Sequence, residues 1–332
     1  SSAASDVYKR QVRKQTPKNY KDYFNKRVHL IEVKNFGRAI NPTKDIAAFF
    51  EVKKIAAEVR PDVIHLHSSK AGAIGRIAFD GKVPMFYTPH GYSFLMENCK
   101  PMKRRMFKLI ESVCAKRNCT TISCSMGEHQ ETLKLTKHAA YVNNGINMAE
   151  LQEIIDRTKK VQHPFTVYTL GRICYQKNPT QFNAVAEALP NIKFVWIGDG
   201  ELRKELKSKN IEITGWADRA TAIRYAVNAD VFLLPSRWEG LPISLLESMY
   251  MKKVCVVSDV IGNRDVIYNN ENGFVCSDTE EFVKAIKKAQ SNTESLVNRA
   301  YQNILDEYNT KIMAEQYSQK YEKAINSMID VA

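Results

Sequence analysis

Short apolar runs alternate with helical stretches along most of this 332-residue chain, and this alternation limits the fold more than any other feature. Where a strand, a helix and a second strand follow one another, the helical crossover lays the two strands side by side in parallel. The length is typical of two domains. The sequence therefore predicts an α/β protein with two parallel sheets.

The predicted strands fall into two groups. The first domain is predicted to contain strands at 28–33, 62–67, 84–88, 120–123 and 140–143. The second is predicted to contain strands at 165–170, 193–197, 211–214, 231–234, 254–257 and 273–276. We place the domains at residues 12–160 and 161–309, with a linker near 158–164 and a last helix over 310–332.

Two carboxylates, Glu239 and Glu247, flank a Gly-Leu-Pro step directly after the predicted strand 231–234. Open α/β sheets bind ligands at the carboxyl ends of their strands, so this loop is a candidate site. Pro242 suits the first position of a helix that runs to about Met251. Helical spacing predicts four core-facing residues in it, Ile243, Leu246, Met249 and Tyr250.

The start of this helix suits an anion. The N–H groups of Gly240 and Leu241 would point at a ligand above the helix, where orphan donors and the helix dipole favour a phosphate. Glu239 and Glu247 cannot bind phosphate themselves. As hydrogen-bond acceptors they suit the hydroxyls of a sugar or a ribose.

A second loop supplies positive charge. Gly171 follows the predicted strand 165–170, and Arg172 and Lys177 lie on the loop before a helix predicted to start near Pro179. Guanidinium and ammonium groups both bind phosphate oxygens. Together the two cations could neutralise a diphosphate.

These motifs resemble the donor site of glycosyltransferase family 4. The resemblance rests on Gly171-Arg172, on Lys177-Asn178, and on the Glu239–Glu247 motif. Segments 61–76 and 87–94 are similar to bacterial exopolysaccharide and O-antigen transferases. The resemblance covers residues 28–325 and implies the GT-B fold, in which two Rossmann-like domains face each other across a cleft. It also implies that the last helix crosses back to the first domain.

The resemblance assigns roles to individual residues. Diphosphate binding is implied for Arg172 and Lys177, contact with the donor sugar for Glu239, and contact with the ribose for Glu247. Further donor contacts are implied for Gly171, Trp216, Gly240, Leu241 and Pro242, with a uracil-type base against the loop 214–218. Four residues are implied to be catalytic, namely His90, Arg172, Lys177 and Glu239.

Three residues are acceptor-side candidates: His67, Lys70 and Tyr92. His65 and His67 alternate on a predicted strand, and His67, nearer the carboxyl end, is the better candidate for the cleft. Lys70 either binds an acceptor phosphate or simply begins a helix.

The implied reaction moves a sugar from a nucleotide-diphosphate sugar, with UDP as the expected nucleotide, to a polyprenyl-linked or saccharide acceptor. The anomeric configuration is retained, and the pathway is that of exopolysaccharide, capsule or lipopolysaccharide. No metal and no cofactor is expected, because Arg172, Lys177 and the helix start would stabilise the diphosphate and no convincing Asp-x-Asp motif is present. The resemblance implies that no protein nucleophile is needed and that the leaving phosphate helps to deprotonate the acceptor.

Positive charge is concentrated in the first half of the chain. Residues 1–160 carry 29 Lys and Arg against 15 Asp and Glu, and the rest carry 20 against 21. The segment 100–110 combines clustered cations with Met102, Met106, Phe107, Leu109 and Ile110. It suits an amphipathic helix on an anionic membrane, or equally a helix that packs its apolar face on the sheet.

Neither a signal peptide nor a membrane-spanning run is recognisable, so we expect a cytoplasmic protein, peripheral on the inner face of the plasma membrane. Two alternatives stay open. One is a GT-B sugar-nucleotide epimerase. The other is a nucleic-acid-binding protein, suggested only by the basic half and supported by no recognisable module.

The start of the chain raises a separate expectation. Residues 1–11 resemble a non-native segment, and the family begins with a strand, a Gly-rich loop and a helix ahead of the matched region. We therefore expect an incomplete first domain, whose missing loop puts the activity of this chain in question.

Overall fold

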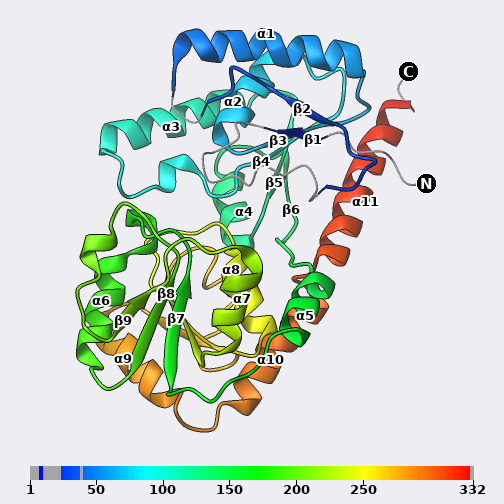
Figure 1. The fold of residues 1–332 in the computed structure, drawn as a ribbon. Helices are drawn as coiled ribbons and strands as arrows, with labels where there is room; N and C mark the ends of the chain where they lie inside the picture. The colour runs from blue at the N-terminus through cyan, green and yellow to red at the C-terminus, as the bar shows by residue number, and fades with distance from the viewer. Residues whose placement is uncertain (1–6, 10–23, 38–39, 330–332) are drawn as a thin grey trace.

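The computed structural model describes residues 7–9, 24–37 and 40–329, and it shows two α/β domains (Figure 1). The elements of the first domain are β1 (Val7–Lys9), β2 (Leu30–Glu32), α1 (Pro42–Val59), β3 (Ile64–His67), α2 (Ser69–Ala78), β4 (Met85–Thr88), η2 (Ser93–Leu95), α3 (Pro101–Cys114), β5 (Thr120–Ser123), α4 (Met126–Leu133) and β6 (Ala139–Tyr141).

The second part contains α5 (Met148–Asp156), β7 (Thr166–Leu170), η3 (Tyr175–Lys177), α6 (Pro179–Ala188), β8 (Lys193–Ile197), η4 (Arg203–Glu205), β9 (Ile211–Ile213), α7 (Arg219–Val227), β10 (Val231–Leu234), α8 (Ile243–Tyr250), β11 (Val254–Ser258), β12 (Phe274–Cys276), α9 (Thr279–Lys288), α10 (Glu294–Asp306) and α11 (Thr310–Ile329). Each predicted strand overlaps an observed one. The segment 1–11, predicted to be non-native, contains β1.

All sheets are parallel, as the alternation of strands and helices predicts. The first domain has a sheet in the order β3-β4-β5-β6, and β1 pairs with β2 in a separate two-stranded sheet. The second domain has the order β12-β11-β10-β7-β8-β9. Because β7 and β10 are neighbours, the loops that follow them leave the same edge of the sheet side by side.

Helices cover both faces of the second sheet. Side chains along each strand alternate between the two faces, so neighbouring residues contact different helices. Tyr168 and Phe232 pack towards α8 and α10, whereas Val167 and Val231 pack towards α6 and α9. The strands are therefore apolar on both faces, and catalytic polar groups can lie only in the loops at the edges.

α8 differs slightly from its prediction. Pro242 is the N-cap with an extended backbone, and the helix begins one residue later at Ile243. Ile243 was predicted to face the core but is 41% exposed, because it lies in the first turn at the sheet edge. Glu247 and Ser248 are buried instead, so α8 is enclosed on nearly every face.

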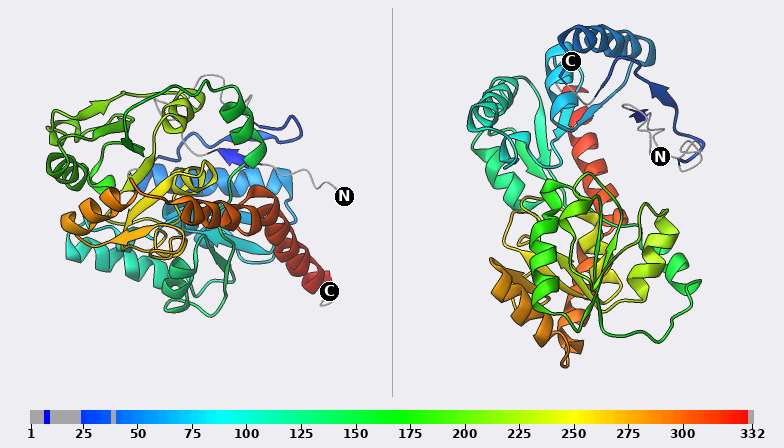
Figure 2. Two further views of the ribbon diagram at one scale, coloured as in Figure 1. Left: turned by 90° about the horizontal axis from the view of Figure 1, so that it is seen from below. Right: turned by 60° about the vertical axis from the view of Figure 1, so that its left-hand side comes forward.

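α11 leaves the second domain and lies along the first (Figures 1 and 2). Four of its side chains pack against Phe86, Ile122 and Val142 of the first domain, namely Met313, Tyr317, Tyr321 and Ala324. This helix ties the two domains together. Within the described ranges, no helix is both long and apolar enough to cross a membrane.

Candidate active site

The two loops predicted to bind a donor meet at the carboxyl edge of the second sheet. Lys177, at the end of η3, places its Nζ 2.7 Å from Oε1 of Glu239. Both side chains are largely buried, at 17% and 7% exposure. A carboxylate is rarely buried without a partner, so this ion pair accounts for the position of Glu239. The structure thus joins two predicted site residues that are 62 positions apart.

One further side chain and two backbone N–H groups lie on the same loops as this ion pair. Gln176 was not predicted, yet its Nε2 donates to the Trp238 carbonyl at 3.0 Å and to Oε2 of Glu239 at 3.3 Å. In the part of the chain that the structure describes, the N–H groups of Gly240 and Leu241 donate no hydrogen bond. They remain available to an anion at the start of α8.

Glu247 is 3% exposed and accepts a 2.5 Å hydrogen bond from Nη1 of Arg219. Burial raises the pKa of Glu247, and Arg219 opposes that rise. Arg219 also donates to Glu150 at 2.8 Å. Arg219 was not predicted from the sequence; its one local signal is its place directly after the N-cap Asp218.

Two predicted donor residues lie at the rim of this site. Arg172 is exposed, and its Nε lies 3.8 Å from Oε2 of Glu201, so its guanidinium is only loosely held. Trp216 is 58% exposed on the loop between β9 and α7. Gly171 has a φ of 150°, a left-handed backbone that favours glycine, and its α-carbon faces Lys177.

The first domain contributes the turn after β4. A β-carbon built on Gly240 would lie 3.1 Å from the Gly91 nitrogen and 3.3 Å from the His90 carbonyl carbon. The backbone that carries His90 therefore lies against the loop that carries Glu239 and Gly240. Asn144 adds a hydrogen bond of 3.0 Å to the Leu241 carbonyl across the same interface.

His90 is linked to His67. Nδ1 of His67 lies 2.9 Å from Nε2 of His90, and both imidazoles reach solvent. Surrounding protein displaces much of the water near them, which lowers the pKa of His90 to about 4, and repulsion from His67 adds to this shift. Removal of water lowers the pKa of His67 too. Both rings are therefore neutral near pH 7, and one can donate a hydrogen bond to the other.

The other two acceptor-side candidates, Tyr92 and Lys70, make contacts within the first domain. Tyr92 is 1% exposed, and its hydroxyl is 2.8 Å from that of Thr132, so it belongs to the core of the first domain. Lys70 lies in the first turn of α2 and forms an ion pair of 2.5 Å with Asp45. One of the two interpretations of Lys70 was that it begins a helix, and Lys70 is the second residue of α2.

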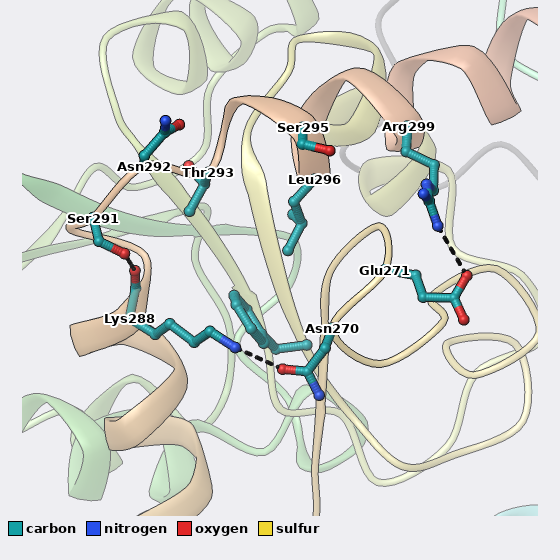
Figure 3. Close-up of a pocket in the computed structure, with 10 residues that line it drawn as sticks. Asn270, Glu271, Lys288, Ser291, Asn292, Thr293, Ser295, Leu296 and Arg299 are labelled. Atoms are coloured by element: carbon teal, nitrogen blue, oxygen red, sulfur yellow. Dashed lines mark hydrogen bonds and ion pairs between the residues drawn. The ribbon is translucent and has the colours of Figure 1, made fainter.

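A shallow pocket of about 260 Å³ lies elsewhere, at the amino-terminal edge of the second sheet (Figure 3). Its two cations are already paired, Lys288 with Asn270 at 2.9 Å and Arg299 with Glu271 at 3.1 Å. None of the predicted site residues lines it. Among the described residues, no cluster of three or more His, Cys, Asp or Glu could hold a metal ion.

Two parallel-sheet domains, with the loops of Lys177 and Glu239 in one and the turn of His90 against them in the other, have the arrangement of the GT-B class. Family models agree with this class: residues 151–326 match "Glycosyl transferases group 1" and residues 12–136 match "Glycosyl transferase 4-like domain". The chain belongs to this glycosyltransferase family, and it is an enzyme of the glycosyltransferase class.

Three known proteins show the extent of the similarity. The UDP-Gal:alpha-D-GlcNAc-diphosphoundecaprenol alpha-1,3-galactosyltransferase of Escherichia coli is 31% identical over 301 residues, which is 80% of this chain and 76% of that protein. The sucrose-phosphate synthase of Thermosynechococcus elongatus has a TM-score of 0.79 at 15% identity, covering 97% and 89% of the two chains. Anabaena HepE with UDP and glucose has a TM-score of 0.71 at 14% identity, covering 91% and 89%.

Proposed function

We propose that this glycosyltransferase moves a sugar from a UDP-sugar to a saccharide carried on polyprenyl diphosphate, with retention of configuration, in cell-surface polysaccharide synthesis. The Lys177–Glu239 ion pair carries the proposal, because it brings a cation and a hydroxyl acceptor together on the loop that leads into α8. The next two N–H groups of that loop, those of Gly240 and Leu241, donate no hydrogen bond to any described residue. The Escherichia coli relative acts on a donor and an acceptor of these classes, judged by its name.

The reaction breaks the bond between the sugar C1 and the oxygen of the β-phosphate. The acceptor hydroxyl forms the new bond to C1, and its proton passes to the leaving diphosphate. Negative charge grows on that diphosphate, so preorganised cations and N–H groups beside it lower the barrier. Lys177 and Arg172 supply the cations, and the sugar hydroxyls replace the ammonium group as partners of Glu239.

Glu247 has a second acceptor oxygen besides the one that Arg219 occupies. We assign this oxygen to the ribose, and we assign the exposed Trp216 to the edge of the base. His90 then faces the donor sugar from the other domain as a neutral hydrogen-bonding group. The positive charge already present at the site leads us to propose transfer without a metal, and addition of EDTA should leave turnover unchanged.

The substitution Lys177→Ala tests the donor assignment. We expect kcat/KM for the UDP-sugar to fall by about a hundredfold or more, because one stabilising cation is lost and Glu239 is left unpaired. The assay measures transfer to a lipid-diphosphate saccharide from each of three donors: UDP-galactose, UDP-glucose and UDP-N-acetylglucosamine. Calorimetry measures the affinity for UDP.

Lys284→Ala serves as the matched control, since Lys284 is an exposed lysine on α9 that pairs only with Glu280. Wild-type turnover in a folded Lys177→Ala protein contradicts the donor assignment. Formation of an epimerised nucleotide sugar without acceptor would instead favour the epimerase alternative.

We also assign α3 to an anionic membrane surface. Met102, Met106, Leu109 and Val113 follow the spacing of one helical face, and all four are exposed, from 42% to 82%. The exposed cations Lys103, Arg105 and Lys108 lie on the same helix. A helix that packed its apolar face on the sheet would bury this stripe, so the structure favours lipid contact, with cations near lipid phosphates.

Vesicle flotation tests the role of α3. The double substitution Leu109→Ser/Val113→Ser should abolish binding to phosphatidylglycerol vesicles at low salt, while transfer to an acceptor in detergent stays at the wild-type rate. Leu133→Ser is the control, because Leu133 is 53% exposed on a different helix. Unchanged flotation of the double variant contradicts the assignment.

A further inference from the structure

Glu128 of α4 is a buried carboxylate in the first domain that the donor site does not use. Its side chain is 1% exposed, and it lies beneath the turn that carries His90. Oε1 accepts a hydrogen bond of 2.6 Å from the Gly91 nitrogen, and Oε2 accepts one of 2.8 Å from the Cys124 nitrogen. A buried carboxylate requires such donors, and hydrogen bonds to an ionised acceptor are short and strong.

The turn above Glu128 has an unusual backbone. His90 has a φ of 53° and Gly91 a φ of 89°, so two successive residues adopt the left-handed conformation. A histidine there is disfavoured by contact between its β-carbon and the backbone. Surrounding contacts must therefore hold the turn, and the Glu128 carboxylate makes the one hydrogen bond that the Gly91 N–H donates among the described residues.

α4 restrains the turn at a second point and is itself held by the second domain. The Thr132 hydroxyl lies 2.8 Å from the Tyr92 hydroxyl, directly after the turn. At the start of α4, the Gly127 nitrogen donates to Asp265 of the second domain at 3.0 Å. The placement of His90 thus depends on a helix that spans the interface.

We infer that Glu128 is a positioning residue for transfer, which holds the His90–Gly91 turn so that the imidazole faces the donor sugar. The inference rests on the proposed function, because that function places His90 beside the sugar. Glu128 itself touches no substrate. Its bond to the Cys124 nitrogen helps to begin α4, where the Ser125 hydroxyl accepts the Glu128 N–H at 3.2 Å as the N-cap. Its second bond, to the Gly91 nitrogen, leaves the helix start and holds the turn.

The substitution Glu128→Gln tests this role. It keeps the size of the side chain but replaces one acceptor oxygen with an NH₂ donor, so either Gly91 or Cys124 loses its acceptor. We expect kcat to fall about tenfold or more with KM for the UDP-sugar within about twofold, because the donor loops are untouched and only alignment changes. Glu131→Gln is the matched control, since Glu131 lies on the same helix and pairs with Lys134.

A double-mutant cycle separates positioning from general destabilisation. If Glu128 acts through His90, Glu128→Gln should lower kcat no further in a His90→Ala background. An equal fold-loss in both backgrounds overturns the inference. Should Glu128→Gln fail to fold, Glu128→Asp replaces it, because it keeps two acceptor oxygens on a shorter side chain and is expected to give the same pattern.

An NMR measurement made without substrate tests the position of the turn independently of the proposed function. In protein labelled with ¹⁵N-glycine, the Gly91 amide, identified by its loss in Gly91→Ala, should resonate far downfield and move upfield in Glu128→Ala, which removes both acceptor oxygens. An unchanged Gly91 amide overturns the inference. If the wild-type enzyme transfers no sugar but the Gly91 amide shifts as expected, the proposed function is rejected. The inference that Glu128 holds the turn then still stands.

Discussion

At the scale of single residues, a side chain takes its role from a partner that is remote in the sequence. Glu239 is an ordinary loop residue until Lys177 pairs with it, and Glu247 is an unpaired buried acid until Arg219 reaches it. The same holds for His90, whose imidazole lies 2.9 Å from that of His67. Repulsion from His67 adds to the lowering of the His90 pKa that removal of water causes.

The removal of water around His90, with repulsion from His67 added to it, predicts a dependence on pH. The pKa of His90 is lowered from 6.5 to about 4, so unfolded His90 binds a proton between these values while folded His90 does not. Stability should therefore fall as the pH decreases from 6.5 towards 4, and it should be insensitive to His90 above 6.5. His67→Asn removes a repelling neighbour and should move the pKa of His90 back towards 6.5.

Titration of the His90 ring by NMR, together with thermal midpoints across this range, measures both effects. A wild-type His90 that titrates near 6.5 would contradict this prediction.

At the scale of elements, one local signal serves two different purposes. α4 begins with Ser125-Met-Gly-Glu128 and α9 with Asp278-Thr-Glu-Glu281, and in both the first side chain caps the helix. The glutamate of α9 stays local and accepts from the Ser277 nitrogen at 2.7 Å. The glutamate of α4 makes the same local bond, to the Cys124 nitrogen at 2.8 Å, and its other oxygen reaches Gly91 on the loop after β4. A capping motif therefore predicts the start of a helix and leaves open what the glutamate does.

The cap of α9 allows a prediction of stability alone. Asp278→Ala removes the acceptor of the 2.9 Å hydrogen bond from the Glu281 nitrogen and should lower the free energy of unfolding by about 1 kcal/mol. Turnover should stay unchanged, because the cap lies outside the donor loops. Urea denaturation measures the loss, with Glu280→Gln on the same exposed turn as the control. A loss of turnover with unchanged stability would show that this helix serves the site directly.

At the scale of the whole molecule, the active site exists only where the two domains meet. Gly240 has no side chain, and this lets the donor loop approach the turn that carries His90. An added β-carbon would lie 3.1 Å from the Gly91 nitrogen and 3.2 Å from the Cys124 sulfur. Asp265 and Asn144 add hydrogen bonds across the same interface.

Gly240→Ala should therefore keep both domains folded but move them apart by a few tenths of an ångström. We expect kcat to fall by about ten- to a hundredfold, because the groups on the two walls lose their alignment. Gly37→Ala is the control, since nothing lies within 4 Å of a β-carbon built there. Turnover and UDP affinity are compared, and wild-type turnover in Gly240→Ala would mean that the contact with the turn is dispensable.

The sequence by itself determined the α/β class, the position of each strand in the two main sheets and the two loops that bring Lys177 and Glu239 together. These features depend on short-range patterns: apolar periodicity, Pro179 at a helix start, and the spacing of Glu239 and Glu247. Only the tertiary structure decided that Tyr92 is buried, that Lys70 pairs with Asp45, and that Ile243 is exposed. Glu128 and Arg219 likewise became candidates only through partners on other elements, because burial and pairing depend on long-range packing that no local pattern records.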